Sequence, residues 1–192
     1  GLAQLEKKVL VIDLDPQGNA TTGLGLSNME NSDETIYGVL NGSKSILEVI
    51  KKTEIKNLDI VTSNVDLSGL EVETAGDNQR AFILKVKLTP YLNDSRGSYD
   101  YILIDCPPSL SLLTVMALAS SHSLVVPLQT EFFALEGLTQ LMKTIERVKV
   151  SVNPELRIRG ILLTMYDKRN KLSSQVEKEA RDYFSDKVYH TV

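Results

Sequence analysis

Residues 8–15 read Lys-Val-Leu-Val-Ile-Asp-Leu-Asp, and this stretch decides the fold class. A short apolar run that is rich in β-branched residues, bounded by charge and followed by Pro16 and Gly18, is typical of a buried strand. Further apolar runs predict strands at residues 57–63, 99–105, 121–128 and 159–165, with the start of a sixth strand at 187–192.

Helical patterns lie between these runs, at residues 45–52, 79–92, 112–119, 132–150 and 173–184. Residues 27–33 are polar and are expected to form a loop. Strand and helix alternate, and the strands are continuous apolar runs rather than alternating ones. This pattern predicts an α/β fold, with a mostly parallel twisted sheet and helices on both of its faces. No internal repeat or linker occurs, so we predict one domain over residues 1–192.

The composition is that of an ordinary globular protein, with 192 residues, 42% hydrophobic and 24% charged. The chain has no apolar run of about 18 residues, so no membrane partner is expected. The single cysteine, Cys106, excludes an internal disulfide and favours a reducing, cytoplasmic location. Its expected role is that of a packed apolar residue rather than a nucleophile.

The charge is divided unevenly along the chain. Residues 1–142 hold 10 Lys and Arg against 18 Asp and Glu, a balance of −8, whereas residues 143–192 hold 11 against 7, a balance of +4. The C-terminal stretch therefore favours either a basic binding face or a solvated helix surface.

Carboxylates follow two of the predicted strands. Asp105 comes after the apolar run 101–104, the Walker B arrangement, and a carboxylate there can hold Mg²⁺ through its water shell. Asp13 and Asp15 are two residues apart on a strand, so their side chains point the same way. Since ligands in parallel α/β folds bind at the carboxyl ends of the strands, these three carboxylates predict a Mg²⁺ site. A capping or solvated acidic strand end is the structural alternative for each of them.

Residues 13–25, Asp-Leu-Asp-Pro-Gln-Gly-Asn-Ala-Thr-Thr-Gly-Leu-Gly, resemble the deviant-Walker signature of the ParA/Soj partitioning ATPases, a P-loop NTPase family. Asp-Cys-Pro-Pro-Ser-Leu at 105–110 resembles a second block of that family. Segments 127–138, 163–170 and 186–191 are similar to further blocks, in family order and over nearly the whole chain.

The resemblance implies a Mg²⁺-dependent ATPase and gives roles to individual residues. Asp15 corresponds to the catalytic carboxylate that positions or activates the attacking water. Asp105 corresponds to the Walker B carboxylate linked to Mg²⁺, and Asp13 lies close to the metal shell. The remaining residues expected near the cofactor ATP are Gln17, Gly18 and Asn19 in a first switch, Pro107 in a second switch, and Thr164 and Met165 near the adenine.

The family's phosphate loop, Lys-Gly-Gly-Val-Gly-Lys-Thr, would lie just before residue 1. The residues that complete its adenine pocket would follow Val192. We therefore expect this chain to be a fragment, truncated at both ends, that binds ATP poorly by itself.

The resemblance also implies partners: an ATP-dependent homodimer, non-specific DNA and a ParB-type centromere-binding protein, in a nucleoid-associated setting. The residues expected at the DNA are Lys178, Arg181 and Lys187, with a second cluster at Lys168, Arg169 and Lys171. Two alternatives are open: a division-site positioning ATPase resembling MinD, and a non-catalytic dimerisation or partner-binding module.

Overall fold

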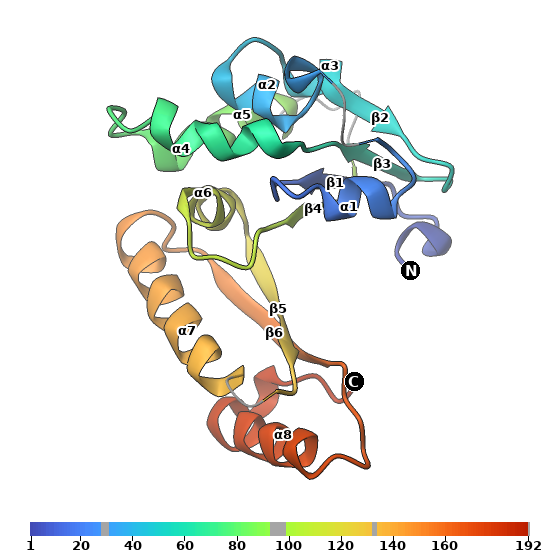
Figure 1. The fold of residues 1–192 in the computed structure, drawn as a ribbon, viewed down its shortest axis with the longest axis vertical. Coiled ribbons are helices and arrows are strands. Elements are labelled where there is room, and N and C mark those ends of the chain that lie inside the picture. The colour runs from blue at the N-terminus through green and yellow to red at the C-terminus, as the bar shows by residue number, and fades with distance from the viewer. Residues whose placement is uncertain (28–30, 93–98, 132–133, 192) are drawn as a thin grey trace. The chain divides into compact units, whose positions relative to one another are not determined.

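The computed structural model describes residues 1–27, 31–92, 99–131 and 134–191 (Figure 1). The chain folds into two compact units, residues 1–120 and residues 121–192. Each unit has its own hydrophobic core.

The first unit contains a four-stranded sheet of order β2-β3-β1-β4. Its strands are β1 (Val9–Asp13), β2 (Ile50–Lys52), β3 (Leu58–Val61) and β4 (Tyr101–Asp105). Its α-helices are α1 (Asn19–Gly23), α2 (Ile36–Asn41), α3 (Ile46–Val49), α4 (Leu70–Glu73), α5 (Ile83–Leu92) and α6 (Leu112–Ser120). Short 3-10 helices are η1 (Ala3–Leu5), η2 (Ser32–Glu34), η3 (Val65–Gly69) and η4 (Arg80–Phe82).

The centre of this sheet is parallel. Strand β1 pairs in parallel with both β3 and β4, while β2 pairs with β3 in the antiparallel sense. Leu10 and Ile12 of β1 are fully buried, and they belong to the core that α2, α5 and α6 complete. At about 25 cal/mol per Å² of apolar surface, such burial is the main stabilising contribution to the unit.

The second unit contains the parallel pair β5 (Ser123–Gln129) and β6 (Arg157–Thr164). Its helices are α7 (Ala134–Ser151), α8 (Lys171–Phe184) and the 3-10 helix η6 (Ser185–Lys187). Helix α7 packs against both β5 and α8 (Figure 1). It buries Leu138, Ile145 and Val148, which recur at helical spacing, and so uses one apolar face as its sequence predicts.

The five strands predicted from apolar runs are confirmed, and the fold class, a mostly parallel sheet with helices, is confirmed with them. The single domain expected over residues 1–192 stays a prediction. Part of the predicted helix 132–150 lies outside the described residues at 132–133, and the predicted loop 27–33 does so at 28–30.

Two sequence predictions are wrong in detail. The segment 45–52 is helical only over α3, and its last three residues form β2. These three residues pair antiparallel with β3 at the sheet edge, where Asp59 of β3 accepts hydrogen bonds from Lys52 and from the Tyr99 hydroxyl, both at 2.6 Å. The sixth strand expected at 187–192 is a single bridge between Val188 and Ile161 that follows η6.

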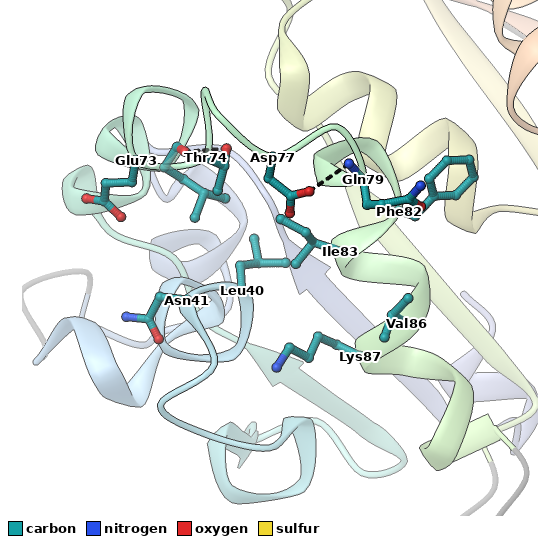
Figure 2. A pocket seen from close by; sticks show the side chains of 11 residues that line it. Leu40, Asn41, Glu73, Thr74, Asp77, Gln79, Phe82, Ile83, Val86 and Lys87 are labelled. Atoms are coloured by element: carbon teal, nitrogen blue, oxygen red, sulfur yellow. Dashed lines mark hydrogen bonds between the residues drawn. The ribbon is translucent and has the colours of Figure 1, made fainter.

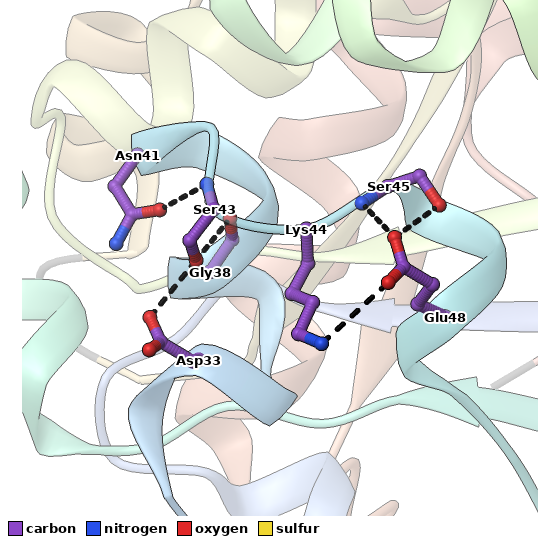
Figure 3. A network of polar contacts seen from close by, with 7 residues as sticks. All are labelled: Asp33, Gly38, Asn41, Ser43, Lys44, Ser45 and Glu48. Atoms are coloured by element: carbon purple, nitrogen blue, oxygen red, sulfur yellow. Dashed lines mark hydrogen bonds and ion pairs between the residues drawn. The ribbon is translucent and has the colours of Figure 1, made fainter.

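A polar network fixes the connection from η2 through α2 to α3 (Figure 3). The Ser43 hydroxyl lies 2.9 Å from the Asp33 carboxylate and 3.2 Å from the Gly38 carbonyl. Glu48 accepts hydrogen bonds from the backbone N–H and hydroxyl of Ser45, each at 2.8 Å, and pairs with Lys44 at 3.5 Å. These contacts cap α3 and set its direction.

Candidate functional site

The carboxyl ends of β1 and β4 lie side by side in the first unit. Asp13 is the register partner of Asp105, so the two predicted strand-end carboxylates come from adjacent residues of paired strands. The backbone N–H of Leu14 donates to the Asp105 carbonyl at 2.8 Å, which continues the pairing by one residue beyond the strand. The fold therefore brings together the three aspartates that the sequence predicted at this edge.

A tight turn follows β1. The Gln17 N–H donates to the Asp15 carboxylate at 3.0 Å, and the Gly18 N–H donates to the Asp15 carbonyl at 2.9 Å. Gly18 has φ 64°, a left-handed conformation that favours glycine, and α1 begins at the next residue. Asp15 is 8% exposed, while Gln17 and Asn19 are exposed on either side of Gly18.

Asp13 is fully buried, and neighbouring donors engage both of its carboxylate oxygens. The Asp15 N–H donates to Oδ1 at 3.1 Å. The backbone N–H and the hydroxyl of Thr21 donate to Oδ2 at 2.8 Å and 2.7 Å. Asp13 therefore differs from the other two aspartates in that its charge is compensated entirely from within the unit.

The carboxyl group of Asp105 lies in an unfavourable electrostatic environment. Its pKa is raised from the usual value, first because the strand end partly desolvates its carboxyl group and then because of the negative charges of Asp13 and Asp15. The residue is nevertheless exposed, so its carboxylate is accessible. A cation at this edge would relieve the repulsion, and Mg²⁺ commonly takes one or two protein carboxylates and keeps several waters. Asp105 fits that role.

Within the described residues, the three aspartates do not form a closed set of metal ligands. In residues 1–27, 31–92, 99–131 and 134–191, no three His, Cys, Asp or Glu side chains converge closely enough to hold a metal ion. The predicted cluster of Asp13, Asp15 and Asp105 thus forms a shared acidic edge and not a three-ligand site.

The segment after Asp105 forms the other side of this edge. Burial and the charges of Asp105 and Asp15 raise the pKa of the Cys106 thiol to about 12, so it stays protonated at neutral pH. This agrees with the interpretation of Cys106 as a packed residue. Pro107 is half-buried, and Thr114 of α6 donates its hydroxyl proton to the Ser109 carbonyl at 2.6 Å.

The two residues predicted near the adenine lie in the second unit, at the end of β6. Thr164 is half-buried, and its carbonyl accepts the Thr130 N–H at 3.3 Å. Met165 has φ 52°, which is unusual for a residue other than glycine, and is 76% exposed.

Some of the residues predicted to contact DNA are exposed lysines, whereas others form ion pairs or hydrogen bonds within the second unit. Lys178 and Lys187 are exposed. Arg181 donates to Glu177 at 2.9 Å and to the carbonyls of Val188 and Tyr189 at 3.3 Å and 3.2 Å, so its guanidinium joins α8 to the segment after η6. In the second predicted cluster, Arg169 pairs with Asp167 at 3.0 Å.

A separate cavity of ≈ 550 Å³ lies among α2, α4, η4 and α5 (Figure 2). Apolar side chains including Leu40, Leu70 and Ile83 line it, with Glu73, Asp77 and Lys87 among its charged residues. Asp77 accepts the Gln79 N–H at 2.7 Å beside it. None of the predicted site residues lines this cavity.

A mostly parallel α/β unit with carboxylates at adjacent strand ends is typical of nucleotide-binding folds, among them the P-loop NTPases. Comparisons with known proteins agree. A family model described as an AAA domain matches residues 1–158. The crystal structure of cobyrinic acid a,c-diamide synthase from Mycobacterium smegmatis, with bound ADP and magnesium, superposes with a TM-score of 0.87 at 33% identity, covering 96% of this chain and 72% of that one.

Curated relatives narrow the class. The chromosome partitioning protein ParA of Caulobacter vibrioides is 50% identical over 191 residues, which span 100% of this chain and 70% of that protein. The sporulation initiation inhibitor protein Soj of Bacillus subtilis is 44% identical over 191 residues, 100% of this chain and 74% of that protein. The chain belongs to the ParA/Soj family of P-loop ATPases, as the sequence blocks predicted.

Sequence reasoning assigned no individual role to two residues that the structure places beside Asp13 in the hydrogen-bond network. Thr21 lies in the block 13–25 and donates to Asp13, and Ser63 follows β3. The Ser63 N–H donates to the Thr21 hydroxyl at 3.0 Å. No local pattern indicates a contact between residues 42 apart in sequence, so only the tertiary structure reveals it.

Proposed function

We propose that this chain carries the hydrolytic site of a Mg²⁺-dependent ATPase of the ParA type that acts in DNA segregation. The observation that carries the proposal is the position of Asp15. It lies at the turn after β1, close enough to Asp105 for its charge to raise the pKa of Asp105, and the Gln17 N–H donates to one of its carboxylate oxygens. Within the described residues, no hydrogen bond reaches its other oxygen, and we assign that oxygen to the attacking water.

In this proposal, Asp15 accepts a hydrogen bond from the water that attacks the γ-phosphate. General-base assistance of this kind contributes roughly 10²–10⁴ in rate. Asp105 would hold Mg²⁺ through its water shell, and the ion would neutralise phosphate charge. Gln17, Gly18, Asn19 and Pro107 would face the phosphates, and Thr164 and Met165 the adenine. Residues 1–192 would act as one ATPase domain, which is supported by a family match that crosses the boundary between the two units.

The proposal extends to the cellular role. The protein would bind non-specific DNA as an ATP-dependent homodimer in the cytoplasm, and a ParB-type partner would stimulate hydrolysis. The relatives named above support a partitioning role, since one is a chromosome partitioning protein. Lys178, Arg181 and Lys187 would supply DNA contacts.

The test compares Mg·ATP binding and hydrolysis by this chain and by a loop-bearing version, which has a phosphate loop in frame before it and the residues that complete the adenine pocket after it. We expect calorimetry to detect binding only with the loop present. In that version, Asp15→Asn should keep Mg·ATP binding and lower kcat at least about 100-fold, because the water loses its acceptor. Asp105→Asn should instead raise the Mg²⁺ concentration needed for half-maximal activity.

Asp100→Asn is the matched control. Asp100 lies at the opposite end of β4, where its carboxylate accepts the Lys8 N–H at 2.8 Å, so its replacement should leave both parameters unchanged. Failure of the loop-bearing version to bind Mg·ATP would refute the ATPase proposal and favour a non-catalytic binding module.

A further inference from the structure

The hydrogen bonds of Asp13 set it apart from a metal ligand. Its side chain is fully buried, and three donors from two residues occupy its carboxylate oxygens at 2.7–3.1 Å. Hydrogen bonds to an ionised acceptor are about twice as strong as neutral ones. To coordinate a cation directly, Asp13 would have to give up some of these bonds inside the core, where an unsatisfied donor is costly.

Thr21 extends this arrangement to a third element. Its hydroxyl donates to Asp13 and accepts the Ser63 N–H, so a chain of hydrogen bonds runs from β1 through α1 to the residue that follows β3 by two positions. Asp13, Thr21 and Ser63 are all 0% exposed. We call these three residues the switch clamp.

The clamp acts directly on the turn that bears Asp15. Asp13 Oδ1 accepts the backbone N–H of Asp15 and so fixes that residue's peptide plane. Asp13 Oδ2 holds the first turn of α1 through Thr21, on the far side of Gly18. Both ends of the turn are thus fastened to one carboxylate.

We propose that Asp13 is a positioning residue, which holds the Asp15 turn through Thr21 and Ser63, and is not a ligand of Mg²⁺. The inference rests on the proposed function in one respect: the turn it positions bears the residue assigned to the attacking water. The existence of the switch clamp as a structural feature does not depend on the role assigned to Asp15.

Amide hydrogen exchange tests the clamp without any ligand. Thr21→Val keeps the side chain's shape and removes the acceptor of the Ser63 N–H. We expect the Ser63 amide to exchange roughly tenfold faster or more, because a lost hydrogen bond opens the local structure. Thr21→Ser, which restores the hydroxyl, should return the exchange rate to the wild-type value. Unchanged exchange at Ser63 in Thr21→Val would overturn the proposal.

Ser63→Ala is the matched control. The clamp uses the backbone amide of Ser63, and its buried hydroxyl has no hydrogen-bond partner within the described part of the chain. This variant should therefore leave exchange at position 63 unchanged. If Thr21→Val does not fold, as judged by circular dichroism, Thr21→Ala gives the same measurement with a smaller side chain.

Kinetics of the loop-bearing protein separate positioning from metal binding. Thr21→Val and Asp13→Asn should both lower kcat by roughly tenfold or more, with the half-saturating Mg²⁺ concentration and the KM for ATP unchanged, and Thr21→Ser should restore kcat. A raised Mg²⁺ requirement in Asp13→Asn, together with normal kcat in Thr21→Val, would identify Asp13 as a metal ligand and overturn the proposal. Absence of hydrolysis in the wild type would refute the proposed function, while exchange at Ser63 would still decide whether the clamp exists.

Discussion

At the scale of single residues, the three aspartates at the ends of β1 and β4 have different environments despite their proximity. Donors within the unit compensate Asp13, the Gln17 N–H partly compensates Asp15, and Asp105 has a raised pKa because its carboxyl group is partly desolvated and faces both other charges. Like charges at a strand end are unfavourable unless a cation joins them. The acidic edge is therefore a feature that favours ligand binding at the expense of the free protein's stability.

This arrangement predicts a pH-dependent gain in stability for Asp105→Asn. Because the folded-state pKa of Asp105 is raised above its unfolded value of 3.8, the folded state holds the proton more tightly, and stability falls as pH rises through that interval. Asparagine removes the charge, so the variant should have a higher Tm than the wild type at pH 7. The difference should vanish below about pH 3.8, where the carboxyl is protonated in both states.

Thermal unfolding followed by circular dichroism from pH 3 to pH 8 measures this effect. Asp100→Asn again serves as the control, since Asp100 is bonded to the Lys8 N–H at the other end of β4. A lower Tm for Asp105→Asn at pH 7 would show that the carboxylate is stabilising and contradict the prediction.

At the scale of elements, the close approach of η2 to α2 depends on a glycine. A Cβ placed on Gly38 would lie 2.2 Å from the Asp33 carbonyl oxygen, which is backbone and cannot move alone. The hydroxyl of Ser43 reaches the same pair of residues and ties the contact together (Figure 3). Any larger residue at position 38 must therefore displace η2.

Gly38→Ala should consequently lower the free energy of unfolding by about 1–3 kcal/mol, the usual range for overpacking. Gly137→Ala is the control in another helix, since nothing lies within 4 Å of its added Cβ. That variant should be neutral or stabilising by about 0.5–1 kcal/mol, because alanine is the better helix former. Urea denaturation of both variants measures the difference, and equal stability of Gly38→Ala and the wild type would contradict the prediction.

At the scale of the whole molecule, the proposed DNA binding would use the second unit, because residues 143–192, which lie within that unit, carry a charge balance of +4 against −8 over residues 1–142. The structure separates the cations that can serve this purpose. Lys178 and Lys187 are exposed, whereas Arg181 is bonded to Glu177 and to two backbone carbonyls. Hydrogen bonds from Tyr166 and Arg181 lower the pKa of the Glu177 carboxyl group. The Arg181–Glu177 pair therefore contributes to the internal structure of the second unit.

Lys178→Glu should weaken non-specific DNA binding by the loop-bearing protein with Mg·ATP and leave Tm unchanged. If Lys178 contacts a phosphate, its loss should reduce the slope of log K against log salt by about 1. Arg181→Glu should lower Tm as well as DNA affinity, because it breaks the tie between α8 and residues 188–189.

Titrations of fluorescent duplex DNA at several salt concentrations provide the measurement. Lys85→Glu, an exposed lysine of α5 in the acidic first unit, is the control and should keep wild-type affinity. Equal weakening by Lys85→Glu and Lys178→Glu would mean that net charge alone, and no particular face, governs binding.

In no described helix is there an apolar stretch long enough to cross a membrane.

Much of this molecule was predictable from the sequence because the decisive patterns are local. Short apolar runs bounded by turn residues or charge predict β1, β3, β4, β5 and β6, because this pattern is local and typical of strands. Pro16 and Gly18 predict the turn, and a parallel sheet requires its strand-end aspartates to share one edge. The ordered blocks from residue 13 to residue 191 predicted the family.

Tertiary structure alone decided the rest. The sequence of residues 45–52 alone predicts a helix. In the folded chain, residues 50–52 instead form a strand, because they pair with the edge of β3 and Lys52 donates to Asp59. Asp13 and Asp15 look equivalent in sequence, yet Thr21 donates to Asp13 only, and the Thr21 hydroxyl accepts the Ser63 N–H from a distant part of the chain. The physical reason is that hydrogen-bond partners and desolvation depend on residues distant in the chain, whereas hydrophobic periodicity and turn chemistry depend on near neighbours.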